Sequence, residues 1–218
     1  MLRGFTLNER RLRERGLGEI EQAVGLRART LTSHALVTEE GRAVLEVVRG
    51  YTRAWRLLLE YDEQRLAAAP ARPVAPTAEL TLDDGRAAAA SLRADLTGRG
   101  EAGPLFGQER GEGLAAILGA IEQTYGGEPL YASVQLRAAH LLYFVIKDHP
   151  FGDGNKRIGT LLFLEYLRRN GLLLRANGTP RLADNAMVAL ALLVAESEPS
   201  QKELMIRLVL NLMEDRAP

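Results

Sequence analysis

Four side chains suited to phosphoryl chemistry lie within nine consecutive residues, from His149 to Arg157. His149 can act as a general base, and Asp153 offers a carboxylate oxygen to a hard cation such as Mg²⁺. Lys156 and Arg157 can donate hydrogen bonds to phosphate oxygens. Phosphoryl transfer needs a base, a cation site and anion donors close together, and this stretch supplies all three.

Two apolar segments with helical spacing flank this stretch and must position it. Residues 134–146 are largely apolar, which predicts a helix buried on most sides. Pro150 ends that helix near His149, because the residue before a proline is driven out of the helical region. A second helix follows, and Asp153 or Asn155 is expected to cap its first turn.

The start of the second helix carries cations where acidic residues would suit the helix dipole. Lys156 and Arg157 occupy its first turn, and Gly152 and Gly154 allow the backbone to approach a ligand closely. Free backbone N–H groups together with two cations favour a bound anion, most often phosphate. From these residues alone, an ordinary loop with a structural histidine remains the alternative.

The stretch from His149 to Arg157 resembles the active-site motif of the Fic/Doc family, H-x-F-x-[DE]-[GA]-N-x-R. It is closest to a bacterial subgroup with a GNKR-type motif. Residues 105–131 resemble the segment leading to the family's flap, and residues 184–199 resemble the end of one bacterial subgroup. The resemblance implies an all-α fold, a Fic-type helical bundle with a short β-hairpin flap.

The resemblance also implies a role for each matching residue. His149 would be the general base that takes a proton from a target hydroxyl, and Asp153 would coordinate Mg²⁺ at the phosphates of ATP. Phe151 should point into the core. The residues that would bind the nucleotide phosphates are Gly152, Gly154, Asn155, Lys156 and Arg157, with backbone N–H groups of this loop.

A target-docking flap is expected at the turn that precedes the buried helix. In the Fic/Doc family the flap is a small hairpin that holds the target segment beside the active site. The resemblance assigns this role to Glu128, Pro129, Leu130 and Tyr131. The residues themselves indicate only a turn and a short extended piece.

Two positions bear on which group would be transferred. Proteins of the family that transfer AMP usually have glycine at the position of Lys156 and a second arginine at that of Thr160. The Doc toxin, which transfers the γ-phosphate, resembles this chain at both positions. Gly154, where Doc has alanine, resembles the AMP-transferring proteins instead. The motif leans towards γ-phosphate transfer and leaves AMP transfer open.

Composition limits the alternatives. The chain has 218 residues, no cysteine and a formal net charge of zero, which argues against thiol chemistry and against nucleic-acid binding driven by bulk charge. No long charge-free apolar run indicates a membrane span, so we expect a cytoplasmic protein. Of the 28 basic residues only three are lysines: Lys147, Lys156 and Lys202.

Three regions are expected along the chain. Residues 1–66 form an N-terminal helical region, 67–78 a proline-rich linker, and 79–218 the Fic/Doc catalytic domain. Within the last region, residues 186–195 are nearly all apolar and are therefore expected to be buried.

Two classes of function follow. The first is an enzyme that moves AMP or the γ-phosphate of ATP to a Ser, Thr or Tyr hydroxyl of a protein substrate. The second is a catalytically silent module that uses the same fold for protein interaction. The pattern of a common inhibitory helix, [ST]-x-x-x-E-[GN], is absent from the sequence. Inhibition would then come from an antitoxin-like partner or from a homo-oligomer.

Overall fold

The structure is a computed structural model, and it describes residue 54 and residues 56–214. Residues 67–214 form one compact unit, and the chain up to Leu66 belongs to another. Of the predicted N-terminal helical region, most lies outside the described residues; residues 56–62 are helical. The stretch from His149 to Arg157 lies in the unit that begins at Ala67.

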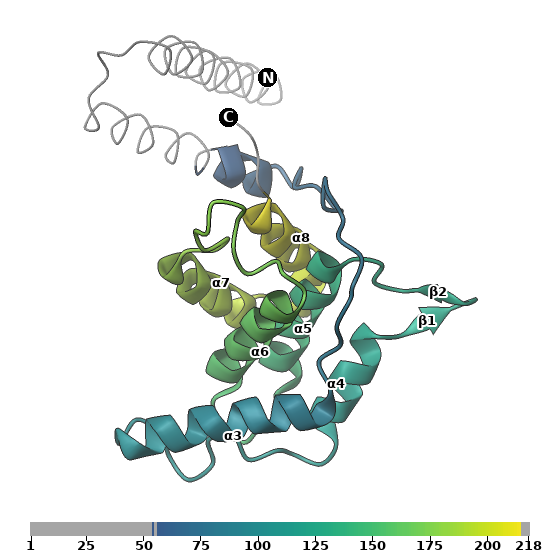
Figure 1. Cartoon of the computed structure of the whole chain (residues 1–218). Coiled ribbons are helices and arrows are strands. Elements are labelled where there is room, and N and C mark those ends of the chain that lie inside the picture. Colours follow the sequence, from purple (N-terminus) through teal and green to yellow (C-terminus); the bar gives the residue numbers. More distant parts are fainter. Residues whose placement is uncertain (1–53, 55, 215–218) are drawn as a thin grey trace. The chain divides into compact units, whose positions relative to one another are not determined.

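This unit is mostly helical, as the sequence predicted (Figure 1). Its only strands within the described ranges form one short antiparallel hairpin, β1 (Thr124–Tyr125) and β2 (Glu128–Pro129). The helices are α3 (Leu82–Gly98), α4 (Gly113–Ile121), α5 (Val134–Asp148), α6 (Asn155–Arg169), α7 (Asp184–Glu196), the 3₁₀ turn η1 (Pro199–Gln201) and α8 (Lys202–Met213). None of the helices described is both long and apolar enough to cross a membrane.

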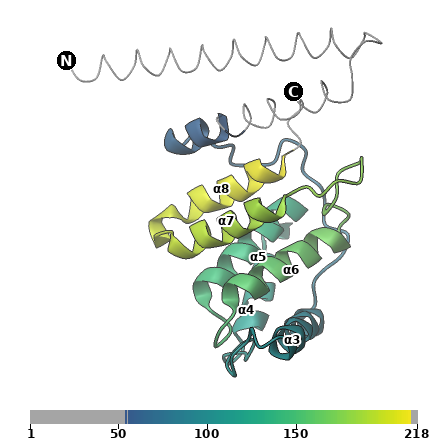
Figure 2. The ribbon, with the colours of Figure 1, turned by 90° about the vertical axis from the view of Figure 1, so that its left-hand side faces the viewer.

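Helix α5 is the centre of the unit and packs against α4, α6, α7 and α8 (Figure 2). Eleven of its 15 residues are buried, which confirms the prediction of a helix buried on most sides. Ser133 caps its start by accepting a hydrogen bond from the N–H of Leu136, 3.2 Å away. A Cβ built on Gly159 of α6 would lie 3.2 Å from side-chain atoms of Val145 and Ile146, so α5 and α6 approach closely just beyond the site.

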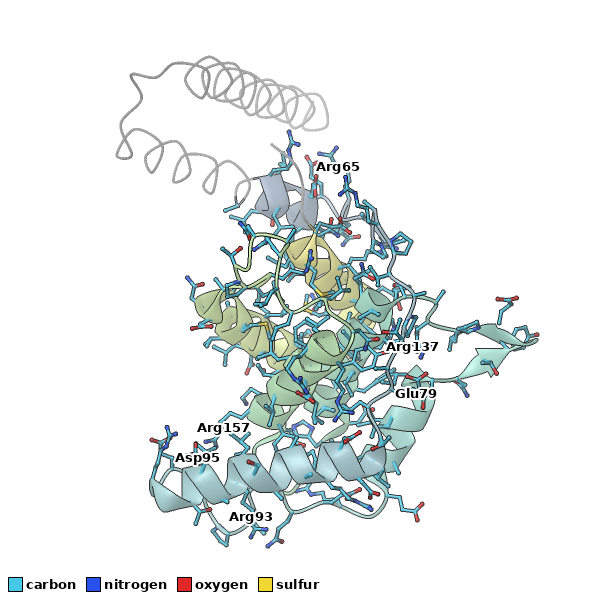
Figure 3. All side chains as sticks on the ribbon, in the orientation of Figure 1. Arg65, Glu79, Arg93, Asp95, Arg137 and Arg157 are labelled. Carbon is cyan, nitrogen blue, oxygen red and sulfur yellow. The ribbon has the colours of Figure 1, made fainter. Side chains whose placement is uncertain are left out.

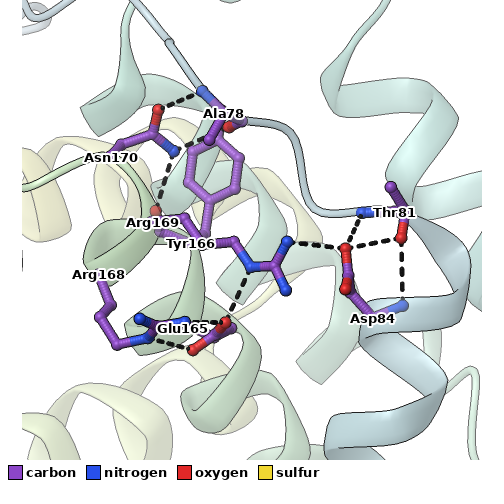
Figure 4. A network of polar contacts seen from close by, with 8 residues as sticks. All are labelled: Ala78, Thr81, Asp84, Glu165, Tyr166, Arg168, Arg169 and Asn170. Atoms are coloured by element: carbon purple, nitrogen blue, oxygen red, sulfur yellow. Dashed lines mark hydrogen bonds and ion pairs between the residues drawn. The ribbon is translucent and has the colours of Figure 1, made fainter.

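An ion-pair network holds α3 against α6 (Figure 4). Arg169 donates to Asp84 of α3 at 2.7 Å and to Glu165 at 2.8 Å. Asp84 also completes a capping box with Thr81 at the start of α3. Hydrogen bonds from Arg169 and Thr81 lower the pKa of Asp84 to about 2, and those from Arg168 and Arg169 lower the pKa of Glu165 to about 2.

The proline-rich segment is extended and hydrogen-bonded to the helices that follow it. The N–H of Val134 donates to the carbonyl of Val74 at 2.8 Å, and the amide of Gln135 bonds both Val74 and Arg72. Asn170, at the end of α6, bonds Thr77 and Ala78. This segment therefore belongs to the compact unit by its contacts, while the boundaries of a catalytic domain stay a prediction.

The expectation that residues 186–195 are buried throughout is wrong. Helix α7 buries Met187, Leu190, Ala191 and Val194, whereas the side chains on its other face are open to solvent. Val188, Leu192 and Leu193 are 62%, 50% and 47% exposed. An all-apolar composition indicates burial, but it does not reveal that neighbouring helices cover only one face.

Candidate active site

His149 lies just beyond the last turn of α5, in the left-handed backbone region (φ 51°, ψ 57°). Its side chain is exposed, and its Nδ1 lies 3.0 Å from the carbonyl oxygen of Lys147. A carbonyl can only accept, so Nδ1 carries the proton in this contact. In the neutral ring Nε2 then has a free lone pair, which is the state that a general base requires.

The loop after His149 is closed by Asn155. Its side-chain oxygen accepts from the N–H of Phe151 at 3.0 Å, and its side-chain nitrogen donates to the carbonyl of Phe151 at 2.9 Å. Phe151 is buried, as predicted, and Asn155 is only 7% exposed. Asn155, the first residue of α6, therefore shapes the loop through its side chain, and only its backbone N–H is left for a ligand.

Gly154, rather than Asp153 or Asn155, caps α6, so the predicted side-chain cap is wrong. Gly154 has φ 85° and forms no side-chain capping bond. Asp153 is exposed, and its Oδ1 accepts from the N–H of Gly154 at 2.6 Å. The geometry of the turn depends on glycine, because an L-residue is strained at this φ.

The first turn of α6 offers free donors. Within the described part of the chain, the backbone N–H groups of Asn155, Lys156 and Arg157 have no hydrogen-bond acceptor, and the turn contains no acidic residue. The positive end of the helix dipole adds to these donors. This N-terminus is suited to an anion.

A segment between α3 and α4 runs alongside the motif. The N–H of Gly107 donates to the carbonyl of Asp153 at 3.1 Å, and the N–H of Gly152 donates to the carbonyl of Gln108 at 2.7 Å. The N–H of Arg110 donates to the carbonyl of Pro150 at 2.8 Å. The N–H of Gly152 is therefore already hydrogen-bonded within the protein. This geometry does not favour the predicted role of Gly152 as a donor to phosphate.

Three cations surround the loop. Lys156 is exposed at the first turn of α6. Arg157, labelled in Figure 3, places its guanidinium 4.5 Å from the centre of the Phe106 ring and donates to the carbonyl of Glu101 at 3.2 Å. Arg110 donates to the carbonyl of Gly152 at 3.3 Å. Sequence reasoning missed Arg110, because it lies outside the motif and only backbone pairing brings it there.

The other two lysines are occupied by contacts with the fold. Lys147 donates to the carbonyls of Ala195 and Ser197 at 3.1 and 2.6 Å, which ties the end of α5 to the end of α7. Lys202 lies over the ring of Phe144, with its Nζ 4.6 Å from the ring centre. Lys156 is the lysine for which the described residues provide no partner.

The structure does not bring the predicted flap residues to the motif. Glu128 and Pro129 pair with β1 through a glycine turn, and they and Leu130 are exposed. Tyr131 stacks on His140, 3.9 Å between ring centres. This hairpin precedes the first residue of α5, whereas His149 follows its last, and a 15-residue helix is about 22 Å long.

The predicted flap residues lie away from the motif because of the direction of α4. Gly113, its first residue, packs against Pro150 in the motif; a side chain there would lie 3.0 Å from the proline ring. The helix then leads away from the motif to the hairpin (Figure 1). The segment that flanks the motif is residues 105–110, which the sequence pattern did not identify.

The donor set fits a nucleotide phosphate with Mg²⁺. No cluster of three or more metal-binding side chains is found among residues 54 and 56–214. Mg²⁺ is commonly held by one carboxylate together with phosphates and water, and Asp153 supplies an exposed carboxylate beside the free N–H groups of α6. Asp153, the first turn of α6, Lys156 and Arg157 would hold these groups.

The unit thus carries an exposed histidine at the end of α5 and free backbone N–H groups at the start of α6, the next helix. Residues 79–167 match the model of the Fic/DOC family, so this part of the chain is a Fic/Doc domain, as its motif predicted. Proteins of this family usually transfer nucleotide-derived groups to proteins and generally use ATP with Mg²⁺. Comparison with curated proteins and with solved structures gives no match.

Proposed function

We propose that this protein transfers a phosphate-containing group from ATP to a hydroxyl group of another protein. The observation that carries the proposal is the start of α6, which has no side-chain cap and offers three free N–H groups and two cations soon after His149. A purely structural loop has no need for an exposed base, an exposed carboxylate and unsatisfied donors together.

His149 accepts the proton of the target hydroxyl at Nε2 while its Nδ1–H stays bonded to the carbonyl of Lys147. The hydroxyl oxygen forms a bond to phosphorus as the bond to the leaving phosphate breaks. The leaving group is ADP for γ-phosphate transfer and pyrophosphate for AMP transfer. The N–H groups of α6, Lys156 and Arg157 stabilise the negative charge of the transferred group. Mg²⁺, when bound at Asp153, neutralises charge on the phosphates.

Transfer of the γ-phosphate is the version we favour. Lys156 is exposed and unpartnered in the described structure, so it is available to a phosphate. Thr160 has no cationic side chain, so it cannot supply the charge that the second arginine gives AMP-transferring relatives. The exposed Lys156 and the absence of that arginine are the two features that favour this direction of transfer.

The test is parallel labelling of a bacterial lysate with ATP labelled at the α or at the γ position, in Mg²⁺. Wild type is compared with His149→Asn, and binding of Mg²⁺ and a non-hydrolysable ATP analogue is measured by calorimetry. His149-dependent label from the γ position alone supports phosphotransfer, and label from the α position supports AMP transfer instead. Absence of nucleotide binding contradicts both and leaves a protein-interaction module.

A further inference from the structure

Phe106 lies beneath the motif, although it comes from the segment between α3 and α4. Its side chain is completely buried, and its backbone is paired with that of Asp153. Gly107, the next residue, donates its N–H to the carbonyl of Asp153 at 3.1 Å. The residue therefore reaches the motif through both its backbone and its ring.

The Phe106 ring occupies the place that a side chain at position 154 would need. A Cβ built on Gly154 would lie 2.3, 2.5 and 2.8 Å from three carbon atoms of the ring. These distances are far below the normal carbon contact of about 3.5–4.0 Å. The ring has little freedom to withdraw because it is fully buried.

The same ring contacts Arg157. The guanidinium carbon lies 4.5 Å from the ring centre, a distance at which a cation is attracted by the face of an aromatic ring. One guanidinium nitrogen donates to the carbonyl of Glu101 at 3.2 Å. Its other N–H groups have no acceptor among the described residues, so they remain available while stacking restricts the side chain.

We propose that Phe106 is a positioning residue that sets two parts of the site at once. Its ring leaves space only for glycine at position 154. The face of the ring positions the Arg157 guanidinium to bind an anion. The second part rests on the proposed function, because the anion is taken to be a nucleotide phosphate. The first part, the coupling between positions 106 and 154, does not depend on any ligand.

The coupling is tested by a double-mutant cycle of Gly154→Ala and Phe106→Val, followed by urea unfolding. Valine has no atom at the three clashing positions. In the Phe106→Val background, Gly154→Ala should lower the folding equilibrium constant by only the left-handed backbone cost, about five- to thirtyfold. With Phe106 present, the loss should be at least ten times larger.

Phe163→Val is the matched control, because Phe163 is also fully buried but is not among the atoms closest to Gly154. It should leave the effect of Gly154→Ala unchanged. An equal effect of Gly154→Ala in the wild-type and Phe106→Val backgrounds would overturn the coupling. If Gly154→Ala does not fold with Phe106 present but folds in the Phe106→Val background, that rescue itself supports it.

The stacking is tested by NMR of the Arg157 side chain. The Phe106 ring should shift its methylene and Nε–H protons upfield, and Phe106→Val should abolish the shift while Phe163→Val preserves it. Phe106→Val should also weaken binding of Mg²⁺ with a non-hydrolysable ATP analogue about two- to fivefold. An unchanged Arg157 spectrum, or unchanged affinity in a wild type that binds, would overturn this part.

Failure of the proposed function gives a different pattern. If the wild type binds no nucleotide, the proposed phosphate site is wrong, and so is the anion-holding role given to Arg157. The double-mutant cycle and the ring-current shift still report whether Phe106 positions the loop and the guanidinium.

Discussion

The carbonyl of Lys147 accepts a hydrogen bond from Nδ1 of His149, so the backbone of α5 determines which nitrogen of the ring is free. The Lys147 side chain holds the same helix end against the carbonyls of Ala195 and Ser197. The tautomer of the proposed base is thus coupled to packing between α5 and α7.

Replacing His149 with asparagine should separate this structural bond from catalysis. Asparagine tolerates the left-handed backbone and can still donate to the carbonyl of Lys147, but it has no group equivalent to Nε2. We expect His149→Asn to fold with an unchanged melting temperature and to lose transfer activity about 10²–10⁴-fold. Activity close to wild type, measured by transfer of labelled phosphate, would rule out His149 as the base.

Asp153→Asn should affect cation dependence rather than folding. An amide carries no charge to attract Mg²⁺, so a higher Mg²⁺ concentration should be needed for half-maximal nucleotide binding, by tenfold or more (roughly the cost of weakening one charged contact). Calorimetry at increasing Mg²⁺ measures this. Asp95→Asn, which removes an exposed carboxylate paired with Arg99, is the control and should leave the dependence unchanged.

Asn155→Ala should destabilise the protein itself. The substitution leaves the buried N–H and carbonyl of Phe151 without the partners at 3.0 and 2.9 Å. Because each unsatisfied buried polar group costs about 1–3 kcal/mol, we expect a loss of that order in the free energy of unfolding. Urea denaturation checks it, and Asn177→Ala, in an exposed turn, should lose much less.

The α3–α6 ion pairs should be lost in acid. The pKa of Asp84 is about 2 in the folded protein, below its usual value near 3.8, so its ionised form stabilises the fold above that usual value. This contribution declines as the pH falls from about 4 towards 2. Asp84→Asn should therefore lower the urea midpoint at pH 6 and have a clearly smaller effect at pH 2.5, whereas a pH-independent effect would contradict the assignment.

The flanking helices and the place of the motif between them could be predicted because both are encoded locally. Pro150, the apolar run of α5 and the cationic first turn of α6 lie within about two dozen residues of one another. The hydrogen bonds that join Gly107, Gln108 and Arg110 to the motif could not be predicted, because pairing between distant loops depends on how α3 and α4 pack. No pattern in the local sequence predicts that pairing.

The hairpin and α7 show the same limit. The turn at Gly126 and Gly127 could be predicted from its residues, but its distance from His149 depends on the direction of α4. For α7 the composition gave no sign of which face meets other helices. Asn155 shows a subtler case, because a side chain expected to bind a ligand instead binds its own loop.

The contacts of the three lysines have a practical consequence for chemical labelling. Two of the amines are engaged, Lys147 by backbone carbonyls and Lys202 by an aromatic ring, whereas Lys156 projects at the start of α6. An amine-selective acylating reagent used at a limiting dose should therefore modify Lys156 ahead of the other two side chains. Peptide mass spectrometry could follow that reaction. If added nucleotide slows the acylation of Lys156, the rate would report how much of the protein has nucleotide bound.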